Sequence, residues 1–529
     1  MSSTTTFPAA RASVQPKFAR HYVDYLIFVV GATLYLLPFL RIMLAPQADE
    51  GILIEGAVRV ARGQLFARDF FEVMGPGTFY WLGAFFKLFG VTFFATRLCL
   101  FTTSLGTGVL IYFLSRRISG RFRYLPCLVV TATYFGTLWP MISHHVDSNF
   151  FALLTFACVL IWHDRHVAIL LPVSGALAGA TTCIMQPKGI LLFFAILAWL
   201  VIQRWRHQAS FRAVGLLMAG YACVVGSVVL YYWSHGALWD LAFATFIHNL
   251  RYYGPMNVVP YASGIIQDHW SPLAFSNSGL FWTVPFASIL LVPFLVIAAL
   301  PVLLLVLAMV NRTSFMKPTL LLYWMCGSAL WLSEFHRRDI SHLVMGSPLL
   351  VILFVHFLSE DRGKLKIRGL QLLAICAALL AGFNLLLVLY THPTPTRVGT
   401  VAMFGTDPVL TYLNEHVASG SELFVYPFYP MYYFLTETDN PTRYSGLGYN
   451  YNTTEQFMNA IQTLERRHVR YVLWNTAYLD KVLPKAFPSL PRIPKSQYLM
   501  EPYLESHYKV VWENKGTVLM ERIGESGAK

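Results

Sequence analysis

Two adjacent carboxylates, Asp49 and Glu50, follow the first long apolar run of the chain. An Asp that opens the helix predicted from "EGILIEGAVRVARG" can accept hydrogen bonds from the free N–H groups of the first turn. A partly desolvated carboxylate can also act as a general base that takes a proton from a reacting hydroxyl. The two roles are compatible, so we treat Asp49 and Glu50 as candidate catalytic residues.

Further acids and histidines lie in two short polar stretches. Glu72 belongs to "RDFFEVMGPG", and "SHHVDSNF" contains His144, His145 and Asp147. Two adjacent histidines do not easily share one ion, so we expect no metal site in that stretch. We expect Asp147, at the mouth of an apolar segment, to face the same cavity as Asp49 and to act as a third catalytic residue.

Cations that suit a phosphate occur in two other stretches. Lys188 lies between two apolar segments in "CIMQPKGILLFF", and Arg337 and Arg338 lie in "SEFHRRDISHLVMGSP". Guanidinium groups bind phosphate through paired hydrogen bonds. The alternatives are that Lys188 extends to lipid headgroups and that the arginines pair with a nearby Asp. The candidate substrate-binding residues are Glu72, His144 and His145 together with others in two stretches: His336, Asp339 and His342 beside the arginines, and His248 and Arg251 in the segment 234–280.

The elements that hold these residues are predicted to be membrane-spanning helices. The 529 residues are 56% hydrophobic and only 13% charged, about half the charged fraction of soluble domains. The net charge of +13 fits basic residues on loops that face anionic lipid. The chain has no basic stripe with a motif that reads RNA or DNA, so no nucleic-acid partner is expected.

Eleven apolar segments are predicted to span the bilayer, which takes about 20 residues. They are 22–44, 94–114, 122–141, 148–163, 167–184, 189–203, 212–233, 281–310, 317–333, 341–359 and 367–391. The aromatic segment 75–90 is shorter and begins with Gly-Pro-Gly. If 75–90 lies along the membrane surface, the basic connections all fall on the same side as the basic N-terminal tail, as the positive-inside rule requires.

This layout predicts a cytoplasmic tail at 1–21, a membrane domain at 22–391 and an exoplasmic domain at 392–529. "THPTPTR" predicts a proline-rich linker into the last domain. Thr406 or Asp407 is expected to cap one helix, and Thr453 or Thr454 to begin a second over "TTEQFMNAIQTLERR". Strands are predicted in "ELFVYP" and "VRYVLW", followed by a hairpin over "YKVVWENKGTVLMER". The domain is therefore α/β, and either binds an acceptor or covers the membrane domain.

The order of these pieces resembles the GT-C glycosyltransferases, in particular bacterial relatives of the protein mannosyltransferases and of the lipid A aminoarabinose transferases. "DEG", "FYWLGAFFKLFG" and "QPKG" carry the resemblance. It implies that Asp49 is the catalytic base, with Glu50 and Asp147 as further acids, and that Lys188 and Arg337 or Arg338 hold the donor phosphate. The lysine that relatives carry shortly after the position of Glu72 is absent, so the resemblance gives Glu72 no clear role.

The resemblance implies transfer of a sugar from a polyprenyl-phosphate donor to a hydroxyl of an envelope glycan, lipid or protein, on the outer face of the plasma membrane. No cofactor is expected, and a divalent metal stays open because a lipid-phosphate leaving group does not demand one. The alternative is a transporter or flippase of lipid-linked sugars, which predicts internal repeats and ionisable residues near the middle of the membrane. The sequence has no clear repeat. A third reading is a non-catalytic scaffold that binds cell-wall polymer.

Overall fold

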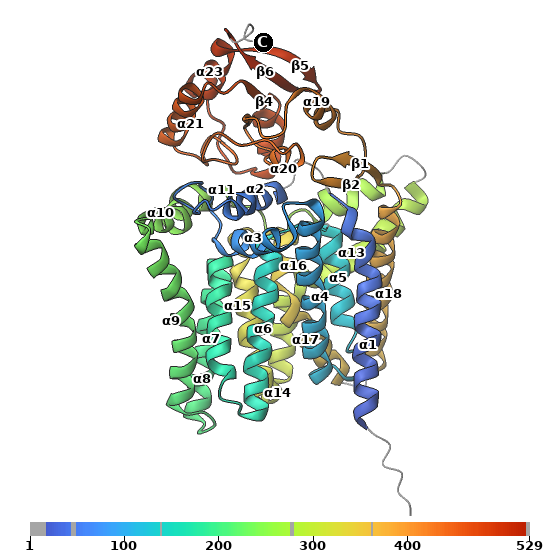
Figure 1. The fold of residues 1–529 in the computed structure, drawn as a ribbon. Helices are drawn as coiled ribbons and strands as arrows, with labels where there is room; N and C mark the ends of the chain where they lie inside the picture. Colours follow the sequence, from blue (N-terminus) through green and yellow to red (C-terminus); the bar gives the residue numbers. More distant parts are fainter. Residues whose placement is uncertain (1–16, 44–48, 138–139, 276–279, 361–362, 525–529) are drawn as a thin grey trace, which may run out of the picture.

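The computed structural model describes residues 17–43, 49–137, 140–275, 280–360 and 363–524. Most of the tail expected at 1–21 lies outside these residues, and the first helix already begins at Lys17. A helical bundle forms one half of the molecule, and an α/β domain covers one end of that bundle (Figure 1).

Every segment predicted to span the membrane coincides with a helix. These helices are α1 (Lys17–Leu36, extended by η1, Leu37–Arg41), α4 (Phe93–Ile118), α5 (Leu125–Thr137), α6 (His144–Arg165), α7 (Leu170–Ile184), α8 (Gln186–Trp205), α9 (Phe211–Ser234), α13 (Leu280–Val310), α15 (Pro318–Ser333), α17 (Pro348–Glu360) and α18 (Lys364–Val388). They run side by side in the bundle (Figure 1). The polytopic helical architecture predicted from the sequence is therefore present.

These helices differ in length. Among the described residues, seven helices are long and apolar enough to cross a membrane, or eight if the bent pair α16 (Ile340–Gly346) and α17 counts as one span. The axes of that pair differ by 71°. Helices α5, α7 and α15 have 13, 15 and 16 residues, so each rises only about 20–24 Å against a hydrocarbon thickness of about 30 Å.

Two helices lie across the covered end of the bundle and do not span it (Figure 1). They are α2 (Glu50–Ala61) and α3 (Gly77–Phe89), and α3 is the surface helix expected at 75–90. They pack closely because Gly56 has no side chain: a Cβ there would lie 2.5 Å from the ring of Phe79. Phe66 stacks on the same ring and Phe70 meets it edge-on, so the segment after α2 also packs against α3.

Short elements make up the rest of the membrane half. Between α9 and α13 these are α10 (Leu238–Ala242), η3 (Phe243–Ile247), η4 (Asn249–Tyr253), α11 (Gly254–Met256), η5 (Ile265–Trp270) and α12 (Ser271–Ala274). The turns η2 (Gly120–Phe122) and α14 (Arg312–Phe315) connect spans elsewhere.

The predicted proline-rich linker is instead a β-hairpin, which corrects the expectation for 391–397. Strands β1 (His392–Thr396) and β2 (Gly399–Met403) pair antiparallel. The hairpin is fixed to the bundle, since Met43 N–H donates to Ala402 O at 2.9 Å and Phe93 N–H donates to Val398 O at 2.9 Å. Prolines are tolerated here because a two-stranded hairpin consists only of edge strands.

The C-terminal domain contains the strands and helices predicted for it. Its sheet has the order β3-β4-β6-β5, built from β3 (Leu423–Tyr426), β4 (Tyr471–Asn475), β5 (Tyr508–Asn514) and β6 (Thr517–Arg522). The pair β3–β4 is parallel and the other pairs are antiparallel. The helices are α19 (Pro408–His416), α20 (Met431–Leu435), α21 (Thr454–Arg467), η6 (Tyr478–Val482), α22 (Leu483–Ala486), η7 (Lys495–Gln497) and α23 (Met500–His507). Asp407 caps α19, and Thr453 forms a capping box on α21.

Helix α20 holds the C-terminal domain on α2. A Cβ at Gly51 would lie 2.4 Å from Met431 N, so only glycine permits this approach of the two backbones. Arg59 donates to Thr442 O at 2.8 Å, and Phe71 N–H donates to Arg443 O at 2.8 Å. The domain is thereby fixed over the end of the bundle at which α2 begins.

Candidate functional site

A cavity of about 430 Å³ lies between the end of the bundle and the C-terminal domain. The membrane half contributes residues 71–74 and 141–145, the start of α2, and parts of α16 and the turn before it. The C-terminal domain contributes 445–448 together with residues of η6 and α22. The cavity therefore exists only where the two halves meet, which no single stretch of sequence reveals.

Asp49 projects into this cavity at the start of α2. It occupies the N-cap position, but among the described residues its side chain accepts no hydrogen bond from the first turn, so the expected side-chain cap is wrong. The side chain is exposed to the cavity space, although protein atoms enclose that space. Burial raises the pKa of Asp49 above its usual value, and the charges of Arg337 and His342 oppose the rise.

Arg337 lines the same cavity and is held rigidly. Its Nε lies 2.7 Å from Asp339 Oδ2, it donates to Ala486 O at 2.9 Å, and its guanidinium lies over the Phe487 ring at 5.0 Å. Arg338 donates instead to Val259 O at 3.1 Å and does not line the cavity. Of the two arginines that the sequence proposed for phosphate, the structure therefore places only Arg337 at the site.

Glu72, a candidate substrate-binding residue to which the resemblance gave no clear role, lines the cavity as well. Its side chain is buried and accepts a hydrogen bond from Ser445 Oγ of the C-terminal domain. Burial raises the pKa of Glu72 well above its usual value; the neighbouring Glu55 adds to the rise, and Arg59 opposes it. A protonated Glu72 is a hydrogen-bond donor, so the cavity presents one acid suited to accept a proton and another suited to carry one.

Three imidazoles meet at one wall of the cavity. One ring nitrogen from each of His145, His336 and His342 lies within 4.8 Å of those of the other two. His145 and His342 line the cavity, as does His144. Although part of the His336 side chain is exposed, the surrounding protein atoms desolvate its ring and lower its pKa, with a further lowering from His342 and an opposing effect from Glu334. The chain thus brings together two histidine-containing stretches that lie far apart in sequence.

Lys188 does not line the cavity, contrary to the role predicted for it. Its side chain has no exposure, its Nζ lies 2.8 Å from Glu334 Oε1, and it donates to Asn149 Oδ1 at 2.8 Å. Glu334 also lies 3.0 Å from His145 Nδ1. The ammonium is neutralised inside the bundle, because an unpaired charge at that position would carry a large desolvation cost. The sequence stretch "SEFHRRD" contains Glu334, but nothing in it shows that Lys188 is the partner.

Glu50 and Asp147 do not line the cavity either, so Asp147 does not face it beside Asp49 as expected, and the catalytic roles of both acids stay predictions. Glu50 is fully buried, pairs with Arg97 through both carboxylate oxygens, and accepts a hydrogen bond from Ile142 N–H at 2.8 Å. It therefore joins α2, α4 and the segment before α6. Asp147 is 2% exposed within α6 and is not among the residues that line the cavity.

His248 and Arg251 are placed apart from the cavity lining. His248 is fully buried among aromatic rings, with the centroids of Phe71 and Tyr252 each 4.9 Å away. Burial lowers the pKa of His248 to about 4. Arg251 is exposed on η4. His248 therefore supports the cavity wall through Phe71, whereas Arg251 faces away from it.

Three tyrosines complete the cavity wall. They are Tyr253 of η4, Tyr451 before α21 and Tyr478 of η6. Tyr253 lies in the polar aromatic stretch "FIHNLRYYGP", so its type was noticeable from sequence. Tyr451 and Tyr478 lie in a domain without a recognisable motif, and only the docking of that domain brings them to the site.

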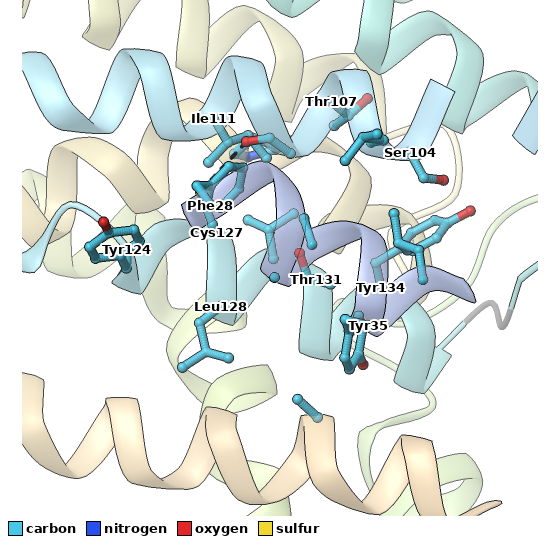
Figure 2. Close-up of a pocket in the computed structure, with 18 of the residues that line it drawn as sticks. Phe28, Tyr35, Ser104, Thr107, Ile111, Tyr124, Cys127, Leu128, Thr131 and Tyr134 are labelled. Carbon is cyan, nitrogen blue, oxygen red and sulfur yellow. Dashed lines mark hydrogen bonds between the residues drawn. The ribbon is translucent and has the colours of Figure 1, made fainter. Parts of the chain in front are cut away.

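A second, apolar cavity of about 450 Å³ adjoins the first. Residues of α1, α4 and α5 line it, including Phe28, Ile111 and Leu128, and a few hydroxyls such as that of Thr131 (Figure 2). Met345 lines both cavities. A polar space under the C-terminal domain and an apolar space between the membrane helices thus lie next to each other, with Met345 in both linings.

Comparison with known proteins identifies the fold. No family model matches the chain, and no curated protein matches it in sequence. The crystal structure of ArnT from Cupriavidus metallidurans bound to undecaprenyl phosphate aligns over 97% of this chain and 100% of that chain, with a TM-score of 0.55 and 13% identity. The same protein in the apo state aligns over 94% and 98%, with a TM-score of 0.56 and 13% identity. The chain therefore has the GT-C-like fold expected from its sequence: a polytopic helical membrane domain followed by a C-terminal α/β domain.

Proposed function

We propose that the chain is a membrane glycosyltransferase that moves a sugar from a polyprenyl-phosphate donor to a hydroxyl acceptor. The observation that carries the proposal is a pair of neighbouring cavities: Asp49 and Arg337 line the polar one, and Met345 lines both the polar and the apolar one. A lipid-linked sugar needs both environments at once. The solved structure with this fold that holds undecaprenyl phosphate supports the same donor class.

The two cavities suggest how the donor is placed. The apolar cavity between α1, α4 and α5 accepts part of the prenyl chain, because burying each methylene contributes about 0.8 kcal/mol. The phosphate then lies near Met345, within the reach of Arg337. The sugar occupies the polar cavity against Tyr253, Tyr451 and Tyr478, whose rings offer apolar faces and hydroxyl groups to a sugar ring.

Asp49 is the base in this reaction. The acceptor hydroxyl oxygen attacks the anomeric carbon of the sugar while the bond from that carbon to the phosphate oxygen breaks. The proton of the hydroxyl passes to Asp49, and the bonding electrons leave on the polyprenyl phosphate. Arg337 stabilises the charge that develops on the departing phosphate. Attack opposite the leaving group inverts the anomeric centre.

The site is proposed to face the outer side of the plasma membrane. Helix α4 begins at Phe93, beside the β1–β2 hairpin that leads into the C-terminal domain. It ends at the basic residues Arg116 and Arg117. The cationic end of α4 therefore lies at the end of the bundle opposite the C-terminal domain. Basic residues favour the cytoplasmic side, which supports a cavity on the outer side, where an envelope glycan, lipid or protein would supply the hydroxyl.

The test uses the purified full-length protein and a panel of labelled undecaprenyl-phosphate sugars, with envelope extracts as the source of acceptors. Transfer of label and release of undecaprenyl phosphate are expected for the wild type, with a loss of about 10²–10⁴-fold in Asp49→Asn. Asp69→Asn is the matched control, because Asp69 pairs with Arg68 outside the cavity. Movement of intact donor across liposomes without transfer would overturn the proposal in favour of a transporter.

A further inference from the structure

The three clustered histidines share one arrangement of their ring nitrogens. The Nδ1 of His145 lies 3.0 Å from Glu334 Oε2, that of His342 lies 2.7 Å from Asp339 Oδ1, and that of His336 lies 3.1 Å from Ser333 O. Among the residues the structure describes, the polar contacts of these rings are all made through Nδ1. Each ring therefore leaves its Nε2 available.

Metal-binding histidines typically have this arrangement. A ligating imidazole almost always donates its other N–H to a carboxylate or a backbone carbonyl, which fixes the tautomer and the ring orientation. For His342 the acceptor is a carboxylate and for His336 a backbone carbonyl, whereas His145 Nδ1 lies 3.0 Å from the Glu334 carboxylate without the geometry of a hydrogen bond. Zinc binds imidazole nitrogens at about 2.0–2.1 Å, so three ligands of one ion lie roughly 3.4 Å apart. The ring nitrogens already lie within 4.8 Å, and side-chain rotation closes the remaining gap.

We propose that His145, His336 and His342 form a three-histidine site for a zinc ion on the wall of the polar cavity. Sequence alone did not indicate this site, because the adjacent His144 and His145 cannot share an ion, and the other two ligands come from the turn before α16 and from α16 itself. Two of the three ligands line the cavity. A fourth position on the ion therefore opens toward the substrate space, as it does in three-histidine catalytic zinc sites.

The charges around the cluster can accommodate a dication. Lys188 is paired with Glu334, and Arg337 is paired with Asp339, so neither cation faces the histidines uncompensated. Asp49 lines the same cavity and adds a third carboxylate. Three acids against two bases leave the surroundings with a net negative charge, which favours a bound cation.

Metal content of the full-length protein, purified without a histidine tag, tests the site directly. After loading with zinc and removal of excess, elemental analysis is expected to give one zinc per chain. Replacement by Co²⁺ is expected to give the intense visible spectrum of a tetrahedral site. A wild-type protein that retains less than a stoichiometric amount of zinc, or that binds Co²⁺ only with an octahedral spectrum, would overturn the proposal.

Variants then assign the ligands. His336→Gln and His342→Ala are each expected to lower zinc affinity at least tenfold in a competition titration with a chromogenic chelator. His416→Gln is the matched control: His416 is exposed, and its Nδ1 also contacts a backbone carbonyl, Tyr412 O, at 3.0 Å, but it lies far from the cluster. His336 is exposed, so His336→Gln is expected to fold even if His342→Ala does not. Unchanged affinity in folded His336→Gln would contradict the assignment.

The role of the zinc ion rests on the proposed function. The ion would bind an oxygen of the donor phosphate, a task that Lys188 does not take because it is paired with Glu334. Zinc-loaded wild type is then expected to bind undecaprenyl phosphate more tightly than the zinc-free protein, and His336→Gln is expected to show no such gain. An equal affinity with and without zinc would exclude this role and leave the metal site standing. Stoichiometric zinc in a protein that transfers no sugar would instead refute the proposed function alone.

Discussion

Lys188 Nζ lies 2.8 Å from Glu334 Oε1, and neither side chain is exposed. This contact joins the start of α8 to the turn after α15, and through His145 it reaches the wall of the polar cavity. The sequence predicts that Lys188 binds phosphate. Its ion pair with Glu334 instead makes it part of the framework that holds His145.

The first prediction is that each half of this pair is needed for stability. Lys188→Met leaves Glu334 as an uncompensated buried charge and is expected to lower the free energy of unfolding by about 3–5 kcal/mol, whereas the double variant Lys188→Met/Glu334→Gln recovers most of the loss. Thermal unfolding in detergent is the measurement. Asp164→Asn, which breaks the exposed pair with Arg117, serves as the control and is expected to cost no more than about 1 kcal/mol. A stable Lys188→Met that loses only donor binding would restore the phosphate role.

Much of the fold was predictable because apolar runs of membrane length have few alternatives to helices. All eleven predicted segments are helices, and the caps at Asp407 and Thr453 follow from local residue types. The hairpin β1–β2 was missed because its prolines resemble a linker, and its pairing with Met43 and Phe93 depends on contacts distant in sequence. Predicted segments and helices differ mainly at their ends, as for the segment 167–184 and the helix Leu170–Ile184, because composition does not show where a helix ends.

The site was predictable only in part. Asp49 and Arg337 do share a cavity, as the spacing of charged residues after apolar segments suggested. Glu50, Asp147 and Lys188 carry the same signal, yet each is buried away from the cavity. A sequence shows which residue types stand near the end of a span, but their orientation around the helix and their ion-pair partners are tertiary properties.

The second prediction concerns the pH dependence of transfer. Asp49 acts as a base only when deprotonated, so kcat/KM is expected to fall as pH decreases through its pKa. Because burial raises the pKa of Asp49, this limb is expected at a higher pH than an ordinary Asp would give. Arg337 opposes the rise, so Arg337→Gln is expected to move the limb to still higher pH. Arg338→Gln, which alters a neighbour outside the cavity, should leave the limb in place. A limb unmoved in Arg337→Gln would argue against Asp49 as the base.

The third prediction concerns the docking of the C-terminal domain. Gly51→Ala places a Cβ 2.4 Å from Met431 N, so α20 must move away from α2, at an expected cost of about 1–3 kcal/mol. Limited proteolysis and hydrogen exchange are expected to show faster opening of the C-terminal domain, with a parallel loss of transfer because that domain forms part of the cavity wall. Gly215→Ala is the control, since nothing lies within 4 Å of a Cβ at that helical position. Unchanged hydrogen exchange in Gly51→Ala would contradict the prediction, because it would mean that α2 and α20 can move apart without loosening the C-terminal domain.

The fourth prediction concerns the apolar cavity. Thr131→Phe adds a ring to a wall of the space proposed for the prenyl chain. Excluding about two methylenes of the chain from this space is expected to lower kcat/KM for an undecaprenyl donor roughly tenfold. A short prenyl donor that does not reach this region should be affected much less, so the ratio of the two rates is the measurement. Thr102→Phe on the exposed face of α4 is the control. Equal losses for both donors would indicate that Thr131→Phe disturbs the bundle rather than the chain, and a loss for neither would place the chain outside this cavity.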